Sequence, residues 1–189
     1  GGAAARPGDV PDETKIPSTL RIMYSVVEPA DKPAQLVRFI QQNPGAKVII
    51  YFLTCACVEF YSTVLPELLG PKGAKAMPVR ALHGRLKQAK REAALADFTK
   101  LPAGCLLCTD VAARGLDIPD VDWVLQYDPP QDPSAFVHRV GRTARMGRSG
   151  SALVLLSPSE DSYVEFIRLR KVPLEEAAPF EEGGGPGGA

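Results

Sequence analysis

The sequence of 189 residues contains no uninterrupted run of 18 apolar residues, which excludes a membrane-spanning helix. It carries no net charge, since 22 Lys and Arg balance 22 Asp and Glu, so no overall basic field indicates a nucleic-acid partner. No signal-peptide pattern precedes the first expected strand, and we expect an intracellular protein. With 45% apolar and 23% charged residues, the composition is that of a globular domain with a sizeable core.

Cysteine is scarce, with four residues at positions 55, 57, 105 and 108. Cys105 and Cys108 have the spacing of half a zinc site, but they lie in an apolar run that resembles a strand. Residues three apart in a strand face opposite sides of the sheet, so these thiols cannot converge on one metal. The pattern favours reduced, buried thiols over a metal site or a disulfide, and we expect this chain to hold no metal.

The sequence also lacks the Gly-x-x-x-x-Gly-Lys-Ser/Thr loop that cradles nucleotide phosphates in many proteins, because the stretch from Gly70 to Lys75 does not fit it. Positive charge is instead gathered in two blocks. The first holds five Lys or Arg and no acid between Val79 and Arg91, and the second runs from His138 to Arg148. Local charge of this kind is a better guide to a ligand than the net charge.

The second basic block contains four arginines and a histidine in eleven residues. Arg142 and Arg145 are three apart, so on a helical turn they point the same way, and two guanidinium forks aimed at one spot suit a polyphosphate. The plainer alternative is a solvated basic face. The block follows a helix start at Asp132 and a buried strand, however, and open α/β sheets bind ligands where strand ends meet loops.

Strand-like and helix-like stretches alternate along the chain, which predicts an α/β fold with a doubly wound parallel sheet and helices on both faces. The expected strands are residues 20–27, 48–53, 78–82, 104–108, 121–127 and 151–156. The expected helices are residues 31–42, 56–69 and 85–99, one from Asp132 and one from Ser159, with Leu86, Ala89, Ala93 and Ala96 facing inward from the third. We expect residues 1–17 to be a disordered linker, 18–174 the folded domain and 175–189 a flexible acidic and Gly-rich tail.

Polar groups follow several of these strands. Thr54 ends the second strand, where a helix cap is the simpler interpretation. Gly84 ends the third and allows close backbone approach, and Gln88 and Arg91 begin the next helix, either as a phosphate-binding end or as an exposed basic face.

A less ordinary string runs from Thr109 to Pro119 after the fourth strand. It combines Thr109 and Asp110 at the strand end, a glycine at position 115 and an aspartate at position 117 that can accept hydrogen bonds from a ribose. Loop structure alone explains any one of these residues, but not the whole string beside the arginine block.

Together, residues 109–119 and 138–145 resemble motifs V and VI of DEAD-box RNA helicases. Residues 48–54 resemble motif IV, and His83 to Arg91 resembles motif IVa, so the likeness covers residues 18–174 in the right order. It implies the second, C-terminal RecA-like domain of such a helicase, because the Asp-Glu-Ala-Asp string of the first domain is absent. Ala144 stands where many relatives have Gly, and we expect a small cost.

The resemblance implies a composite ATP site that closes between two domains. The first domain would hold ATP and Mg²⁺, while Arg142 and Arg145 of this chain would act as arginine fingers on the γ-phosphate. Gly115 and Asp117 would complete the ATP contacts, with Asp117 on the ribose. The expected residues at the interdomain interface, or in support of the motifs, are Asp110, Arg114, His138 and Arg139.

The resemblance further implies that Thr54, Gly84, Gln88, Arg91 and Thr109 grip the RNA sugar-phosphate backbone without reading its sequence. RNA and the N-terminal RecA-like domain are thus the expected partners, and this chain alone is expected to be inactive. Strings at residues 55–61, 123–130 and 134–138 resemble the branch that assembles the large ribosomal subunit, which implies pre-ribosomal particles and a nucleolar location in the nucleus.

Two alternatives stay open. The fold could be a non-catalytic RecA-like module that binds RNA or docks a protein, although such a module has no use for Arg142, Arg145 and Asp117. It could also belong to a DNA-translocating helicase of the wider superfamily, but the sequences of motifs V and VI disfavour this alternative.

Overall fold

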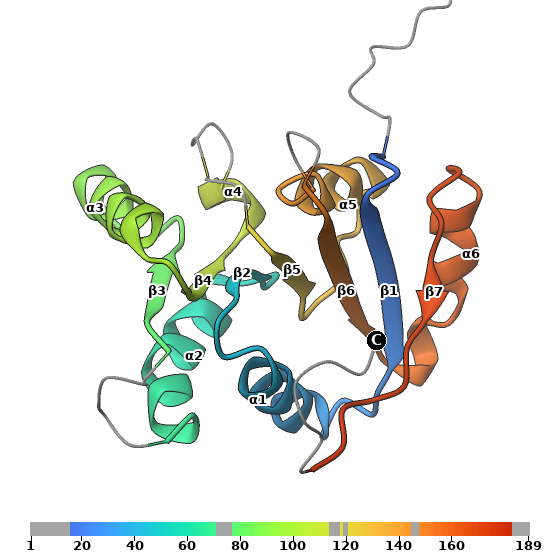
Figure 1. The fold of residues 1–189 in the computed structure, drawn as a ribbon, viewed down its shortest axis with the longest axis horizontal. Coiled ribbons are helices and arrows are strands. Elements are labelled where there is room, and N and C mark those ends of the chain that lie inside the picture. Colours follow the sequence, from blue (N-terminus) through green and yellow to red (C-terminus); the bar gives the residue numbers. More distant parts are fainter. Residues whose placement is uncertain (1–15, 71–76, 114–117, 119–120, 145–147, 183–189) are drawn as a thin grey trace, which may run out of the picture.

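The structure, a computed structural model, describes residues 16–70, 77–113, 118, 121–144 and 148–182. Within these ranges seven strands form one sheet: β1 (Leu20–Val26), β2 (Lys47–Tyr51), β3 (Val79–Leu82), β4 (Gly104–Cys108), β5 (Trp123–Gln126), β6 (Gly150–Leu156) and β7 (Glu175–Glu176). Their order across the sheet is β3-β4-β2-β5-β6-β1-β7, and every pair is parallel (Figure 1). The predicted parallel sheet is confirmed.

The helices lie on both faces of the sheet, also as predicted. They are α1 (Lys32–Gln42), α2 (Cys55–Leu68), α3 (Gln88–Lys100), α4 (Asp110–Ala113), α5 (Pro133–Val140) and α6 (Ser162–Arg168), with a 3-10 turn at Pro158–Glu160. Buried side chains of α1 and α2 pack on one face, and those of α3, α4, α5 and α6 pack on the other. No helix in the described ranges has both the length and the apolar character needed to cross a bilayer.

The centre of the sheet is buried on both faces, which explains the continuous apolar runs of β2 and β4. Cys105 packs in the core on one face and Cys108 in the core on the other, so the two thiols face apart as predicted. Burial raises the pKa of the Cys105 thiol to about 12, so this thiol stays protonated at neutral pH.

The inward face predicted for the third helix is wrong. Ala89, Ala93 and Ala96 are exposed, and the buried side chain of α3 is Phe98, with Leu95 packed against the same core. A methyl group gains little from burial compared with a leucine or a phenylalanine, so the two large side chains set the rotation of the helix.

The boundary drawn at residue 174 also needs correction, because the described part of the predicted tail, residues 175–182, packs on the domain. Residues 175–176 form β7 beside β1. Beyond it the Phe180 ring meets Phe39 edge-on with ring centroids 5.6 Å apart. The buried Gln35 side chain donates to the Phe180 carbonyl at 3.0 Å and accepts from its amide at 2.6 Å. The apolar ring and this two-way hydrogen bonding supply anchors that an acidic composition alone does not reveal.

Candidate nucleotide and nucleic-acid site

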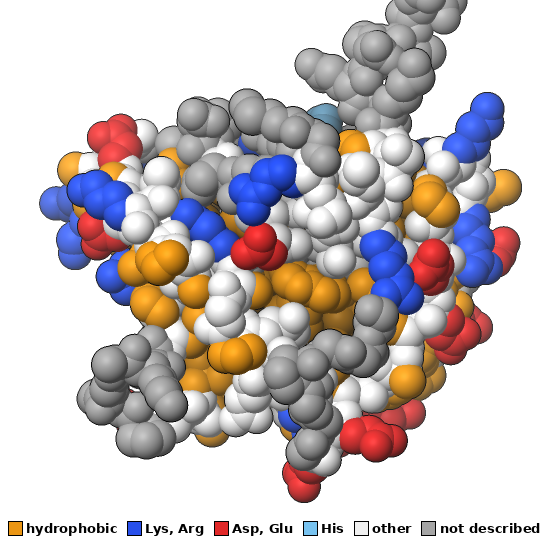
Figure 2. Space-filling model, in the orientation of Figure 1, with side chains coloured by type: hydrophobic (Ala, Val, Ile, Leu, Met, Phe, Trp, Pro, Cys, Tyr) orange, Lys and Arg blue, Asp and Glu red, His pale blue; other side chains and the backbone are white. Residues whose placement is uncertain are grey.

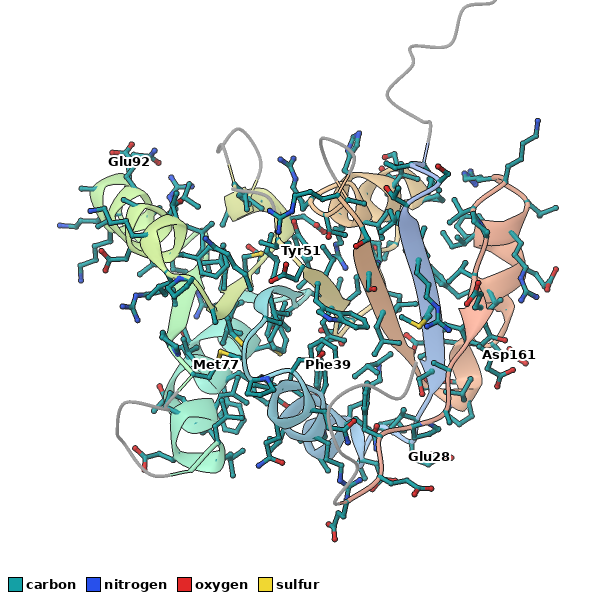
Figure 3. The ribbon with its side chains drawn as sticks, viewed as in Figure 1. Glu28, Phe39, Tyr51, Met77, Glu92 and Asp161 are labelled. Atoms are coloured by element: carbon teal, nitrogen blue, oxygen red, sulfur yellow. The ribbon has the colours of Figure 1, made fainter. Side chains whose placement is uncertain are left out.

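Arg139, on the last turn of α5, is buried inside its own domain with 1% of its surface exposed. Its Nε and Nη2 each donate to a different oxygen of Asp110 at 2.7 Å. Its Nη1 donates to the Asp128 carbonyl at 2.8 Å and to the Gln126 side chain at 3.2 Å. The guanidinium also lies over the Tyr51 ring, 4.8 Å from the centroid; Figure 3 labels Tyr51 near the centre of the molecule. All of these partners lie at or just beyond the carboxyl ends of β2, β4 and β5.

Arg139 was expected at the interdomain interface or in support of the motifs. Its side chain turns inward and is neutralised by Asp110, so a supporting role stays a prediction and direct contact with the interface is disfavoured. A buried guanidinium needs a charged partner and saturated hydrogen bonds, and the forked carboxylate supplies both. Asp110 joins the first turn of α4 to the end of α5 through these two hydrogen bonds, and its expected supporting role stays a prediction.

Arg142 lies one turn beyond Arg139, and its side chain has a different environment. It is half-exposed, and none of the described residues forms a hydrogen bond or ion pair with its guanidinium. It lines a small cleft with six neighbours from two helices and a strand end: Tyr51, Asp110, Ala113, Ala135, His138 and Arg139. His138 is exposed at the same cleft. The cleft therefore presents a guanidinium and an imidazole, a donor set that suits an anion.

The backbone that carries Arg142 is fixed from behind. The Thr143 hydroxyl donates to the Val121 carbonyl, and the Val121 amide donates to the Arg142 carbonyl at 3.3 Å. Gly150 passes so close that a Cβ there would lie 2.5 Å from the Ala144 nitrogen. This loop has little freedom to move Arg142 away from the cleft.

Ala144 adopts a φ of +58°, in the left-handed region that favours glycine. A side chain in this conformation costs about 1–2 kcal/mol before its packing is counted. The buried methyl group, which is 3% exposed, recovers part of that cost by packing in the core.

A second polar corner lies at the carboxyl ends of β3 and β4. Three side chains there each keep a buried polar atom without a hydrogen-bond partner among the described residues: His83 Nδ1, Arg91 Nε and Thr109 Oγ1. Buried polar groups are nearly always hydrogen-bonded, so three unsatisfied ones near two strand ends make this corner a candidate ligand site. Figure 2 shows Lys and Arg side chains over α3 beside this corner, together with Asp and Glu.

The remaining residues predicted for this corner are also at its surface. Thr54 caps α2, since its hydroxyl accepts from the Cys57 amide at 3.1 Å, and it is exposed. Gln88 begins α3 and donates to Glu92 at 2.7 Å. Gly84 is exposed, and a Cβ built on it would meet nothing within 4 Å, so packing within this domain does not require a glycine here. Close approach of another molecule to the backbone would require one.

Four predicted site residues, Arg114, Gly115, Asp117 and Arg145, lie outside the described residues. Conversely, sequence reasoning assigned no role to Tyr51, Glu59, His83 or Gln126. Their position at or next to strand ends was the available signal for Tyr51, His83 and Gln126. Glu59 lies inside α2, where the sequence offered no signal of a functional role.

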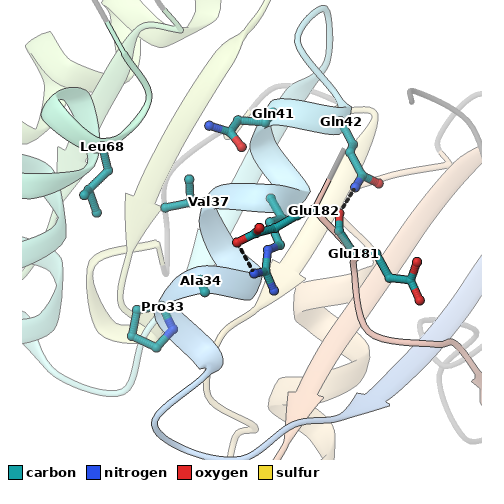
Figure 4. Close-up of a pocket in the computed structure, with 9 residues that line it drawn as sticks. Pro33, Ala34, Val37, Gln41, Gln42, Leu68, Glu181 and Glu182 are labelled. Carbon is teal, nitrogen blue, oxygen red and sulfur yellow. Dashed lines mark hydrogen bonds and ion pairs between the residues drawn. The ribbon is translucent and has the colours of Figure 1, made fainter. Parts of the chain in front are cut away.

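A groove of about 680 Å³ lies elsewhere, on the outer side of α1 (Figure 4). Its walls come from α1, the end of α2 and the segment after β7. Two of its polar side chains are already paired, because Arg38 bonds Glu182 at 2.9 Å and Gln42 donates to the Glu181 carbonyl at 3.2 Å. The groove therefore differs from the β3 corner, where buried polar atoms are left without partners.

Comparison with known proteins identifies the fold. A family model described as "Helicase conserved C-terminal domain" matches residues 31–147. The DEAD-box ATP-dependent RNA helicase 18 of Oryza sativa subsp. japonica is 54% identical over 163 residues, which are 86% of this chain. The chain is a DEAD-box helicase C-terminal domain. It spans 25% of the length of that relative.

Solved DEAD-box structures agree with this assignment. The C-terminal domain of the DEAD-box protein Dbp5 superposes with a TM-score of 0.74 at 26% identity, covering 85% of this chain and 91% of the other. Domain 2 of the DEAD-box helicase Mss116p, solved bound to an RNA duplex, gives a TM-score of 0.71 at 30% identity over 87% and 66% of the two chains. The RecA-like fold predicted from the sequence is thus confirmed.

Proposed function

We propose that this chain is the second motor domain of an ATP-dependent RNA helicase, with Arg142 and Arg145 as its arginine fingers. The observation that carries the proposal is the half-exposed Arg142 guanidinium, which has no partner among the described residues and is held at a cleft by a fixed backbone. A guanidinium that meets charge developing on a transferring phosphoryl group accelerates hydrolysis by about 10³–10⁵.

In this proposal an N-terminal RecA-like domain would hold the triphosphate and Mg²⁺, and the C-terminal domain described above would close over them. Arg142 and the exposed His138 would face the phosphates across the interface. Gly115 and Asp117 would contact the nucleotide, and Arg114 would join the two domains. Arg139 contributes indirectly, because its ion pair with Asp110 fixes the helix turn that precedes Arg142.

RNA would lie over the second corner. Arg91 and Thr109 supply buried donors that lack partners among the described residues, while Thr54, Gly84 and Gln88 line the rim. Backbone phosphates and sugars are the ligands that such donors recognise without reading sequence. The structure of Mss116p domain 2 on an RNA duplex supports an RNA partner for this fold.

The two corners are joined by a single peptide bond. Thr109 offers its unsatisfied hydroxyl to the RNA side, and Asp110 binds Arg139 next to the ATP side. RNA bound to Thr109 would therefore also affect Asp110, which holds Arg139 and the chain that leads to Arg142. This connection would couple RNA binding to ATP hydrolysis.

The test compares this chain alone with the protein that also contains its N-terminal RecA-like domain. We expect RNA to stimulate ATP hydrolysis in the two-domain protein, duplex RNA to be unwound, and neither activity in this chain alone. RNA-stimulated turnover by the isolated chain would contradict the composite site. A two-domain protein that binds RNA without hydrolysing ATP would instead favour the non-catalytic RNA-binding or docking module.

We also propose that the full protein acts in assembly of the large ribosomal subunit, in the nucleolus. The support is the resemblance of the sequence at residues 55–61, 123–130 and 134–138 to the helicase branch that assembles this subunit. The expected result is cosedimentation of the tagged full protein with precursors of the large subunit. A protein found only with mature polysomes or free of RNA would overturn this assignment.

A further inference from the structure

Glu59 connects two elements of the proposed RNA corner. It lies on the second turn of α2, and its Oε2 accepts a hydrogen bond from Arg85 Nη1 at 3.2 Å. Its Oε1 lies 3.6 Å from His83 Nδ1. The His83 side chain is 6% exposed, whereas those of Glu59 and Arg85 are 42% and 65% exposed. One carboxylate thus bridges α2 and the loop that follows β3.

Arg85 occupies a position within the RNA surface proposed above. It follows Gly84 directly and precedes Gln88 by three residues, and α2, which carries Glu59, begins next to Thr54. A carboxylate on such a surface opposes the phosphate backbone unless a cation neutralises it. In this structure Arg85 is the charged side chain within hydrogen-bond distance of Glu59 that does so.

We propose that Arg85 is a further RNA-phosphate contact and that Glu59 is its counter-ion when RNA is absent. Binding of RNA then exchanges one anion for another on the same guanidinium, so Glu59 lowers the affinity of the site for RNA. The inference rests on the proposed function, because it extends the RNA corner.

The geometry allows this exchange. An exposed arginine–carboxylate pair is weakly stabilised, since both ions remain hydrated and two long side chains must be held in place. A phosphate offers the same guanidinium an equivalent charge-assisted bond, so RNA can take the place of the carboxylate. From the usual strength of exposed pairs, the competition should change RNA affinity by about two- to fivefold.

The experiment measures RNA binding by the full protein with its N-terminal domain. The probe is a fluorescein-labelled oligouridylate in the presence of a non-hydrolysable ATP analogue, followed by anisotropy at about 50–200 mM salt. Wild type is compared with Glu59→Gln, Arg85→Gln and the double variant. The Arg85 side chain is 65% exposed and that of Glu59 is 42% exposed, so neither belongs to the core and folding should be preserved in all three variants.

We expect Glu59→Gln to tighten binding and Arg85→Gln to weaken it, each about two- to fivefold at low salt. Loss of one phosphate contact should also reduce the slope of log Kd against log salt by about 0.7 for a single strand. The double variant should behave like Arg85→Gln, because Glu59 acts only through Arg85.

Three outcomes would overturn the proposal. An equal gain in affinity from Glu59→Gln with and without Arg85 would mean plain repulsion of RNA by the acid. Weaker binding by Glu59→Gln would mean that Glu59 positions the loop. An unchanged salt slope in Arg85→Gln would mean that Arg85 touches no phosphate.

Two controls separate this inference from the proposed function. Glu165→Gln removes the acid of a similar exposed pair, Arg168–Glu165 at 3.0 Å on α6, and should leave affinity and slope unchanged. Arg91→Gln should weaken RNA binding whatever Arg85 does. If Arg91→Gln binds RNA as wild type does, or if wild type binds none, the proposed RNA corner itself is wrong.

Discussion

Arg139 and Arg142 are three residues apart on one stretch of chain, yet their environments are opposite. Arg139 is 1% exposed, and its guanidinium is saturated by Asp110, Gln126 and a carbonyl. Arg142 is half-exposed, and no described residue pairs with its guanidinium. The same side chain therefore serves the fold at one position and remains available to a ligand at the next turn.

The difference originates in the sheet. Arg139 projects toward strand ends that carry a carboxylate, an amide and an aromatic ring, whereas Arg142 lies past the end of α5 at the rim of the cleft. The β3 corner follows the second pattern, since Arg91, His83 and Thr109 keep buried polar atoms unsatisfied among the described residues. The proposed ATP- and RNA-binding surface is therefore distinguished by polar side chains that lack hydrogen-bond partners among the described residues, at the Arg142 cleft and at the β3 corner. The number of arginines does not distinguish it.

The largest effect should come from Arg142→Ala in the full protein. We expect ATP hydrolysis to fall about 10³–10⁵-fold, because the transition state loses its arginine finger. ATP binding should be largely retained, and the free energy of unfolding should change by less than about 0.5 kcal/mol. Arg145→Ala should give the same kinetic pattern. Equal losses of ATP binding and hydrolysis would contradict a finger role.

Asp110→Ala, unlike Arg142→Ala, should mainly lower stability. We expect a loss of folding free energy of about 3 kcal/mol, measured by urea unfolding. The substitution strands a buried guanidinium, and the estimate is at the lower end because the Asp110 side chain is 32% exposed. Asp110→Asn is the matched control and should cost about half as much, since an amide oxygen still accepts one hydrogen bond. An Asp110→Ala protein as stable as wild type would mean that Arg139 needs no partner.

Removal of residues 175–189 tests whether the far edge of the sheet contributes stability without touching either arginine. We expect a loss of about 2 kcal/mol in this chain, because β1 loses its neighbour and the Phe180 ring leaves Phe39. Thermal and urea unfolding measure it. A truncated chain of unchanged stability would restore the original boundary at residue 174.

The smallest effect should come from Lys171→Gly. Lys171 has a φ of +61°, like Ala144 at +58°, but it is exposed and remote from the arginine loop. Relief of this strain, less the entropy that glycine adds to the unfolded chain, should raise stability by about 0.5–1 kcal/mol. Ala144→Gly should gain less, because it also deletes a buried methyl group. A larger gain at Ala144 would show that its methyl packs poorly.

Sequence patterns predicted the elements well where one physical effect dominates. The apolar runs of β2 and β4 indicated buried parallel strands, and Asp132 indicated the start of α5, which its side chain caps at the Ser134 amide. Patterns failed where the deciding partner is remote. Asp110 lies 29 residues before Arg139, and Phe180 lies 145 residues after Gln35, so neither contact was predicted from local spacing.

The same limit applies to the working surface. Local sequence located Arg142, Thr109 and Arg91, but only the hydrogen-bond partners in the folded chain distinguish a saturated arginine from an available one. The bridge from Glu59 to Arg85 spans 26 residues and joins two elements that the sheet brings together. Its residues carry no local signature.

The central claim is that Arg142 completes an ATP site on another domain. The most direct measurement is the distance between its guanidinium and the γ-phosphate in a crystal structure of the full protein with single-stranded RNA and a non-hydrolysable ATP analogue. We expect hydrogen-bond contact, at about 3 Å. An Arg142 side chain paired with an acid of either domain, or facing solvent in that closed complex, would contradict it.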